Sequence, residues 1–254
     1  MSKTSIAWTE RTWNPITGCT KLSAACAHCY AETMAKRLQY MGQKRYANGF
    51  ALTLHPEALN EPKRIKQPSM FFVCSMSDIF HEDVPESFID KIMDVIKATP
   101  EHTYQILTKR TDRMYDYFTY GMYPVPDNAW IGTTVEDDRY AERAKILASI
   151  KPAKVRFLSI EPMLGPFGWL NLEGIDWVIV GGESGPQARP MKKEWVLDLQ
   201  KQCAAQDVPF FFKQWGTWGE DGIKRDKKAN GCLLDGKVYQ EWPKAWKGGQ
   251  NEGI

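Results

Sequence analysis

The chain has 254 residues, of which 43% are hydrophobic and 25% are charged, with ten Trp and ten Tyr. This composition excludes an intrinsically disordered chain, and the length fits one large α/β domain without deciding between one domain and two. The formal net charge of +2 gives no electrostatic argument for a nucleic-acid or membrane partner.

The N-terminal residues lack the apolar run of a signal peptide, and the sequence contains no uninterrupted apolar stretch long enough to span a bilayer. A cytoplasmic protein that does not enter the membrane is therefore expected. In a reducing compartment, clustered cysteines are better explained by a metal site than by disulfides.

Three of the six cysteines, Cys19, Cys26 and Cys29, lie close together with the spacing Cys-x6-Cys-x2-Cys. Structural zinc normally has four protein ligands, whereas a [4Fe-4S] cluster held by three cysteines keeps one iron free for a small molecule. The spacing favours the open cluster. Zinc completed by His28 or a distant ligand, and free redox thiols, are the alternatives. The other cysteines occur singly and are predicted to be small buried apolar residues: Cys74, Cys203 and Cys232.

The segment after the cysteine loop has the periodicity of an amphipathic helix. Tyr30, Met34, Leu38 and Met41 recur at helical spacing, with Ala31 and Ala35 beside them. A stripe of methionine and aromatic residues at this spacing is ordinarily core, so it is predicted to face inward and is given no chemical role.

Short apolar segments then alternate with helical patterns. About eight strands are predicted, at residues 13–17, 50–54, 70–74, 104–107, 130–133, 155–158, 177–180 and 210–212. Continuous apolar strands alternating with helices favour a parallel sheet covered by helices, and about eight repeats favour a (β/α) barrel, full or partial. A doubly wound open sheet is the alternative, although no Gly-x-Gly-x-x-Gly follows any strand.

Polar side chains follow every predicted strand, and in a β/α barrel these ends converge on one mouth, where active sites are built. Glu161 directly follows an apolar strand and precedes a proline, and Lys213 directly follows three phenylalanines. These two are the strongest candidates outside the cysteines. Asp78 and His81 are candidates for moving protons, and Lys109 for neutralising a carboxylate or phosphate. For any one of these residues the alternative is a structural role, because βα loops are polar in any case.

A glycine-rich segment follows the seventh predicted strand. Its backbone N–H groups carry little steric cover, which suits the close approach of a carboxylate, ribose or phosphate. The residues predicted to contact a bound cofactor are Ser159, Gly181, Gly182, Glu183 and Ser184.

The last stretch, residues 217–254, is rich in Gly, Lys and Trp. It is predicted to be a C-terminal extension packed on a barrel formed by residues 1–216, with a hairpin that turns at Asp235-Gly236. Contact with nucleic acid through residues 224–228 and nearby tryptophans is the alternative.

A set of short motifs covers nearly the whole chain: Trp13-Asn14-Pro15, Thr17-Gly18-Cys19, Cys26, Cys29-Tyr30, Ser77-Asp78, Leu107-Thr108-Lys109-Arg110, Ser159-Ile160-Glu161-Pro162, Gly181-Gly182-Glu183-Ser184 and Phe212-Lys213-Gln214-Trp215-Gly216. In these motifs the chain resembles a largely phage-associated, three-cysteine, radical-SAM-like family that is distantly similar to spore photoproduct lyase. The chain departs from the common radical-SAM pattern in two ways. The first cysteine gap is six residues instead of three, with the aromatic residue after the last cysteine, and Gly-Gly-Glu follows a late strand instead of an early one.

The resemblance implies a radical S-adenosylmethionine (SAM) enzyme. Cys19, Cys26 and Cys29 would hold a [4Fe-4S] cluster whose open iron binds SAM, and cleavage of SAM would give a 5′-deoxyadenosyl radical that abstracts hydrogen from the substrate. The implied substrate is a small molecule or a nucleobase, either free, as a nucleotide or in DNA. The implied partners are nucleic acid and an electron donor such as flavodoxin or ferredoxin.

Two other functions are consistent with the sequence. One is a metal- or cluster-stabilised binding protein that partners another phage protein without turnover. The other is a metal-dependent hydrolase or lyase that uses Asp78, His81 and Glu161 on the same barrel.

Overall fold

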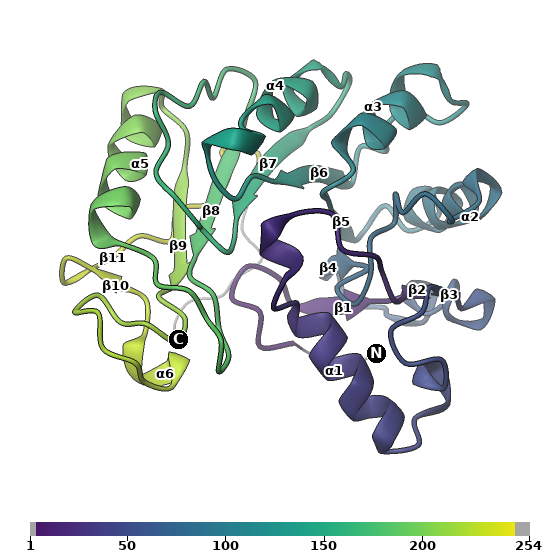
Figure 1. Ribbon diagram of the computed structural model, residues 1–254. Helices are drawn as coiled ribbons and strands as arrows, with labels where there is room; N and C mark the ends of the chain where they lie inside the picture. Colours follow the sequence, from purple (N-terminus) through teal and green to yellow (C-terminus); the bar gives the residue numbers. More distant parts are fainter. Residues whose placement is uncertain (1–3, 247–254) are drawn as a thin grey trace.

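The computed structural model describes residues 4–246, and its central element is a seven-stranded sheet in the order β1-β4-β5-β6-β7-β8-β9. Every neighbouring pair is parallel. The sheet curls into a half-barrel with helices outside it, which confirms the predicted α/β partial barrel (Figure 1). The strands are β1 Arg11–Trp13, β4 Met70–Val73, β5 Thr103–Thr108, β6 Ala129–Thr134, β7 Val155–Ile160, β8 Trp177–Gly181 and β9 Phe210–Gln214.

The strand predicted at residues 50–54 does not join this sheet. Its last two residues form β3, Thr53–Leu54, which pairs antiparallel with β2, Ile16–Thr17. Pro15 lies between β1 and β2, and a proline has no N–H for a sheet ladder, so the chain leaves the parallel sheet there. The parallel sheet therefore has seven strands.

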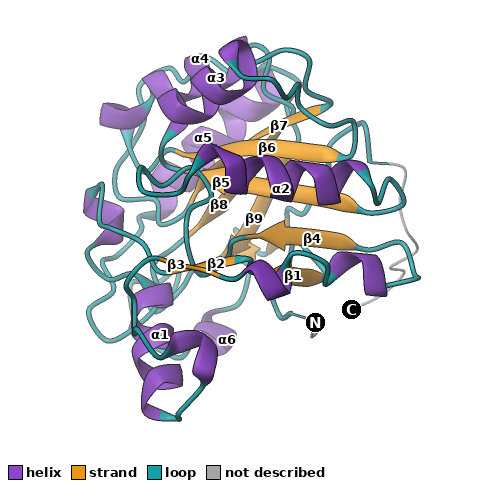
Figure 2. Cartoon of the chain, turned by 90° about the vertical axis from the view of Figure 1, so that its right-hand side faces the viewer, coloured by secondary structure: helices purple, strands orange, loops and turns teal. Residues whose placement is uncertain are grey.

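Four helices, α2 to α5, cover the outer face of the half-barrel. Figure 2 shows α2 lying over the strands. The buried side chains of these helices belong to one large apolar cluster with the outward-facing residues of the strands. No helix of the described residues is long and apolar enough to cross a membrane. The α-helices are α1 Tyr30–Tyr40, α2 Glu86–Lys97, α3 Thr111–Tyr120, α4 Glu142–Ser149, α5 Lys193–Ala205 and α6 Lys227–Asn230. The 3₁₀ turns are η1 Ala24–Cys26, η2 Lys44–Tyr46, η3 Pro56–Ala58, η4 Pro62–Arg64 and η5 Asp138–Tyr140.

Helix α1 buries only the alanines beside the stripe that is predicted to face inward. Ala31 and Ala35 are its buried residues and pack against Met76, whereas Tyr30 and Met34 are exposed. The helix lies beside the half-barrel instead of over the sheet (Figure 1), and its fully buried side chains are both small. The prediction of a buried methionine and tyrosine stripe is wrong.

The inner face of the half-barrel is aromatic near the amino ends of its strands. Trp130, Phe157, Trp177 and Phe211 form a second cluster, separate from the residues under the helices. Trp242 stacks on Trp177 with the ring centroids 5.1 Å apart. The start and the end of the described chain thus both fill the concave side, because Trp8 and Trp246 belong to the same cluster.

The C-terminal segment contains the predicted hairpin. Strands β10, Leu233–Leu234, and β11, Lys237–Val238, pair antiparallel, and Asp235 and Gly236 both have positive φ, as a two-residue hairpin turn requires. The division between 1–216 and 217–254 stays a prediction, and residues 247–254 lie outside the described part. Cys74 and Cys203 are buried as predicted, whereas Cys232 is half-buried, so its prediction is wrong.

Gly132 in β6 provides a test of the packing inside the half-barrel. A Cβ at this position would lie 2.6 Å from the Phe157 ring. Because overpacking a core costs about 1–3 kcal/mol, Gly132→Ala is expected to lower the free energy of unfolding by about this amount in urea titrations.

Gly168→Ala is the matched control, because the nearest atom to its added Cβ would be 3.9 Å away. It is expected to change stability by less than about 1 kcal/mol. Equal effects of the two substitutions would contradict the packing described for β6 and β7.

Candidate active site at the carboxyl ends of the strands

The cysteine loop, residues 18–29, connects β2 to α1 and crosses the carboxyl edge of the sheet. Gly18 bridges to Ser77 in the segment after β4, and the Gly18 N–H donates to the Met76 carbonyl over 3.0 Å. Cys29 is the N-cap of α1, and the hydroxyl of Tyr30 donates to the carbonyl of Ser75. The loop is therefore fastened to the sheet at both of its ends.

All three cysteines of the loop are free and half-buried. The pKa of Cys19 is raised to about 11. Burial is the larger cause, and the negative charge of the nearby Asp78 carboxylate is the second. Burial would also raise the pKa of Cys26, but hydrogen bonds from the backbone of Leu22 and Ser23 and the charge of Lys109 outweigh it and hold the value below the ordinary range. The two thiols thus differ in how readily they form the thiolate that a metal requires.

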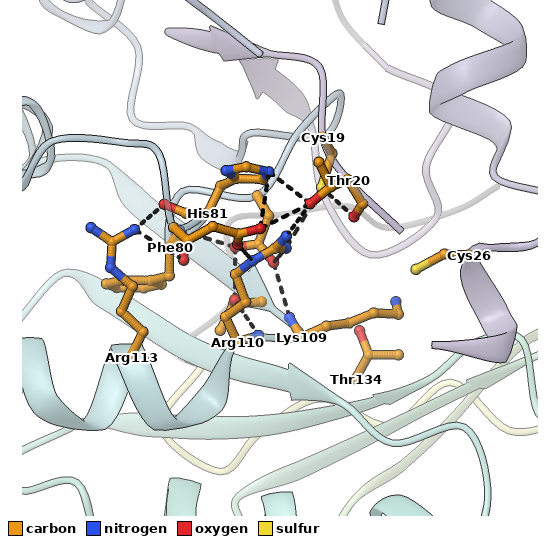
Figure 3. Close-up of polar contacts among 12 residues, drawn as sticks. Cys19, Thr20, Cys26, Phe80, His81, Lys109, Arg110, Arg113 and Thr134 are labelled. Carbon is orange, nitrogen blue, oxygen red and sulfur yellow. Dashed lines mark hydrogen bonds and ion pairs between the residues drawn. The ribbon is translucent and has the colours of Figure 1, made fainter. Parts of the chain in front are cut away.

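Arg110, the second residue after β5, joins the loop to the barrel (Figure 3). Its Nη1 donates to Cys19 Sγ over 3.6 Å and to Asp78 Oδ2 over 3.2 Å. Its Nη2 donates to Thr20 Oγ1 over 2.8 Å, and its Nε to Glu82 Oε2 over 2.6 Å. One guanidinium therefore contacts both residues at the start of the loop and two carboxylates.

The side chains of the predicted pair Asp78 and His81 are not hydrogen-bonded to each other in the described structure. They are linked indirectly, because Arg110 bonds to Asp78 and to Thr20, and Thr20 bonds to His81. Asp78 accepts from Thr108 Oγ1 over 2.7 Å, and from the backbone N–H groups of Phe80 and Lys109. His81 is fully buried, and burial with the charge of Arg110 lowers its pKa. Both residues therefore hold the loop in place.

Glu136, after β6, is a site residue that sequence reasoning did not select. It is fully buried, and it accepts from Ser23 Oγ over 2.5 Å and from Arg143 Nη1 over 3.1 Å. Lys109 Nζ lies 3.8 Å from the same carboxylate. The available signal was its position just after an apolar strand, which it shares with Glu161.

The predicted residues Glu161 and Lys213 form an ion pair. Lys213 Nζ lies 2.7 Å and 2.9 Å from the two Glu161 oxygens. The two side chains are about one-fifth exposed, at 20% and 18%. They meet across β8, where a Cβ on Gly181 would lie 3.1 Å from the Glu161 carboxyl carbon. Gly181 therefore makes room for this pair.

The carboxylate of Glu183 is occupied by contacts with other side chains of the protein. Arg189 binds it through both arms of its guanidinium, with Nε 2.8 Å and Nη2 2.6 Å from the carboxylate. His28 Nδ1 lies 3.3 Å from Glu183 Oε1, and Arg189 also donates to the Ala24 carbonyl. Burial would raise the pKa of Glu183, but Arg189 outweighs it and lowers the value. Glu183 thus holds the far end of the cysteine loop.

The glycines after β8 serve close packing of the backbone. A Cβ on Gly182 would lie 1.9 Å from the Trp215 carbonyl oxygen, and the Gly182 N–H donates to the Gln214 carbonyl. The Gly185 N–H donates to Thr217 Oγ1. Ser184 is exposed, and Ser159 is buried inside β7. The loop after β8 therefore fits tightly against the loop after β9, and its first glycine N–H is already bonded.

The cysteine loop carries the kind of donor atoms that iron–sulfur clusters use. Among the described residues, no three His, Cys, Asp or Glu side chains are grouped closely enough to hold one metal ion. This holds for Asp78, His81 and Glu161, and equally for Cys19, Cys26 and Cys29. Three unpaired thiols on one loop are the ligands that iron–sulfur clusters use, and Arg110 and Lys109 supply positive charge beside Cys19 and Cys26. In their chemistry, the three free cysteines fit the ligand set of such a cluster.

Comparisons with known proteins agree with this fold. The model of a family described as a protein of unknown function (DUF5131) matches residues 3–243. No curated protein matches the sequence. A single-site mutant of spore photoproduct lyase with dinucleoside spore photoproduct is similar in structure, with 15% identity, a TM-score of 0.50, and coverage of 90% of this chain and 72% of that chain.

Two further structures of that lyase are similar at lower scores. Another single-site mutant, in which a cysteine is replaced by serine, is 17% identical with a TM-score of 0.47, over 72% of this chain. A double mutant with bound AdoMet and dinucleoside spore photoproduct is 15% identical with a TM-score of 0.47, over 84% of this chain. The chain spans 59% of the length of each of these two.

A double-mutant cycle on Glu161 and Lys213 tests the ion pair at the mouth. Surface pairs contribute less than about 1 kcal/mol, and breaking a buried pair costs about 3–5 kcal/mol. Because this pair is one-fifth exposed, Glu161→Gln and Lys213→Gln are expected to show a coupling free energy of about 1–3 kcal/mol in urea titrations.

The exposed pair Lys145 and Glu142 on α4 is the control, with side chains 80% and 69% exposed. Its coupling is expected to stay below about 0.5 kcal/mol. A coupling this small for Glu161 and Lys213 would contradict the geometry described at the mouth.

Proposed function

This chain belongs to the DUF5131 family, and we propose that it is a radical SAM enzyme in which Cys19, Cys26 and Cys29 hold a [4Fe-4S] cluster. The observation that carries the proposal is the position of the three free cysteines. They lie on one loop at the carboxyl edge of a curled parallel sheet, with two cations beside them. When bound, the reduced cluster with SAM would supply a 5′-deoxyadenosyl radical for hydrogen abstraction from the substrate.

The inner face of the half-barrel suits such chemistry, because it changes from apolar to polar along the strands. Successive inward positions run from Trp130 to Thr134 on β6, and from Phe157 to Ser159 and Glu161 on β7. The aromatic layer would keep water away from the amino ends of the strands. The polar layer would face a substrate below the cysteine loop.

The side chains of the mouth divide into two groups. Asp78, His81 and Glu183 position the cysteine loop through Arg110, Thr20 and Arg189. Glu161 and Lys213 contact each other and stay partly open, so in this proposal they bind and orient the substrate or SAM. Lys109, beside Cys26 and Glu136, would neutralise an anionic group.

For the substrate we favour a nucleobase, either in a nucleotide or in DNA. The support is the fold similarity to a lyase whose structure holds dinucleoside spore photoproduct. The ion pair of Lys213 with Glu161 also offers a donor and an acceptor side by side, as the edge of a base requires.

The cluster is tested by anaerobic reconstitution with iron and sulfide. About four irons per chain are expected, with an EPR signal after dithionite reduction that SAM perturbs, and with 5′-deoxyadenosine formed from SAM. Cys19→Ala, Cys26→Ala and Cys29→Ala are each expected to lose the signal and the cleavage.

Cys232→Ala is the matched control, because Cys232 is also half-buried but lies in the C-terminal segment, where its sulfur contacts Gln240. It is expected to keep iron and cleavage at the level of the unchanged protein. One zinc per chain without SAM cleavage would overturn the proposal and favour a metal-stabilised binding protein.

The substrate class is tested by fluorescence anisotropy with a labelled single-stranded oligodeoxynucleotide. If DNA is the substrate, binding at low salt is expected to weaken steeply as salt is raised, because phosphate contacts release counterions. Absence of binding at low salt would exclude DNA and leave the free nucleobase or nucleotide.

A further inference from the structure

Arg110 makes a contact that loop anchoring alone does not require. Among the described residues, it is the cation that donates a hydrogen bond to a sulfur of the cysteine loop, from Nη1 to Cys19 Sγ over 3.6 Å. Its side chain is only 8% exposed, so water competes little for this contact. Thr20, the next residue, could be held by Nη2 without any approach of Nη1 to the sulfur.

The direction of Nη1 is fixed from the barrel side. Asp78 accepts from Nη1 over 3.2 Å, and Asp78 is itself held by Thr108 Oγ1 and by the N–H groups of Phe80 and Lys109. Glu82 accepts from Nε over 2.6 Å. Two carboxylates outside the loop, Asp78 and Glu82, therefore fix the orientation of the guanidinium plane.

The direction of Nη2 is fixed by a proton assignment. The Asp83 N–H donates to His81 Nδ1 over 3.1 Å, so the ring proton of neutral His81 lies on Nε2 and is donated to Thr20 Oγ1 over 2.9 Å. The Thr20 hydroxyl in turn donates to Glu82 Oε1. The remaining lone pair of Thr20 Oγ1 accepts from Arg110 Nη2, so Nη2 is directed at this oxygen.

Hydrogen bonds to the sulfur ligands and net charge are among the features that set the reduction potential of iron–sulfur clusters. A donated N–H withdraws electron density from the sulfur and stabilises the reduced cluster more than the oxidised one. Two carboxylates accompany the single positive charge of Arg110 here, so its net charge cannot supply this effect. The remaining feature of Arg110 that can raise the reduction potential is the N–H directed at the sulfur of Cys19.

We propose that Arg110 is a positioning residue that raises the reduction potential of the cluster by donating Nη1–H to the sulfur of Cys19. This inference rests on the proposed function, because it needs a cluster bound at Cys19. Asp78, Glu82, Thr20 and His81 keep the donor aimed at the sulfur. Reduction adds one electron to the cluster from dithionite, which is oxidised, and no covalent bond of the protein forms or breaks.

The test is an anaerobic redox titration of the reconstituted protein with dithionite and mediators, followed by EPR, with no SAM or substrate present. Arg110→Lys keeps the charge and loses the fork, and it is expected to titrate at a more negative potential with the same iron content. Thr20→Val removes the anchor of Nη2, together with the contacts of the Thr20 hydroxyl to His81 and Glu82, and leaves Arg110 itself unchanged. It is expected to shift the potential in the same direction by less.

Arg113→Lys is the matched control. Arg113 donates to the carbonyl groups of Phe80, His81 and Val84, so it holds the same segment without touching a cysteine. It is expected to titrate like the unchanged protein. A shift in Arg113→Lys equal to that in Arg110→Lys would mean that loosening the segment is enough, and would overturn the inference.

The remaining outcomes are also decisive. If Arg110→Lys and Thr20→Val keep full iron and titrate like the unchanged protein, the inference fails while the proposed function stands. If Arg110→Lys loses its iron, the potential of Thr20→Val is used instead. A more negative potential than that of the unchanged protein supports the inference, and an equal potential contradicts it. If the unchanged protein binds no cluster, the proposed function fails, and this inference falls with it.

Discussion

The cysteine loop has little regular structure of its own, and its position depends on buried carboxylates at the ends of three strands. Asp78 reaches the loop through Arg110. Glu136 reaches it through Ser23. Glu183 reaches it through Arg189 and His28. A buried carboxylate is costly unless it is paired, and each of these acids has a partner that lies on the loop or is hydrogen-bonded to it. The loop and the mouth of the half-barrel therefore specify each other.

This arrangement explains why so many ionisable groups occur at one edge of a protein of nearly neutral net charge. The parallel sheet brings the carboxyl ends of its strands together, and the outer helices bury the opposite face of every strand. The inner face then has to be filled from within the chain. Trp8 and Trp242 do this at the amino ends of the strands, while the cysteine loop covers the carboxyl ends.

The sequence was sufficient for the parts of the structure that rest on local patterns. Apolar runs located the parallel strands from β4 to β9, and the spacing of Cys26 and Cys29 marked the loop. Partners far apart in sequence were not predictable, because Arg189 and Ala24 meet only after folding. The burial of Tyr30 and Met34 on α1 was mispredicted for a related reason. Periodicity shows that a helix has an apolar stripe, but not whether the helix lies over a sheet or beside it.

The contacts of the acids also indicate which one remains for a ligand. Glu183 has a bidentate arginine and a histidine, and Glu136 has a serine and an arginine. Glu161 differs, because its partners Lys213 and Gln214 come from β9 and not from the cysteine loop. A ligand that replaced the ammonium of Lys213 at one oxygen would leave the loop unchanged. At the other acids, replacing Arg110, Ser23 or Arg189 would remove a contact with the loop. Under the proposed function, we therefore expect the substrate to bind at the pair across β8, because its contacts do not involve the cysteine loop.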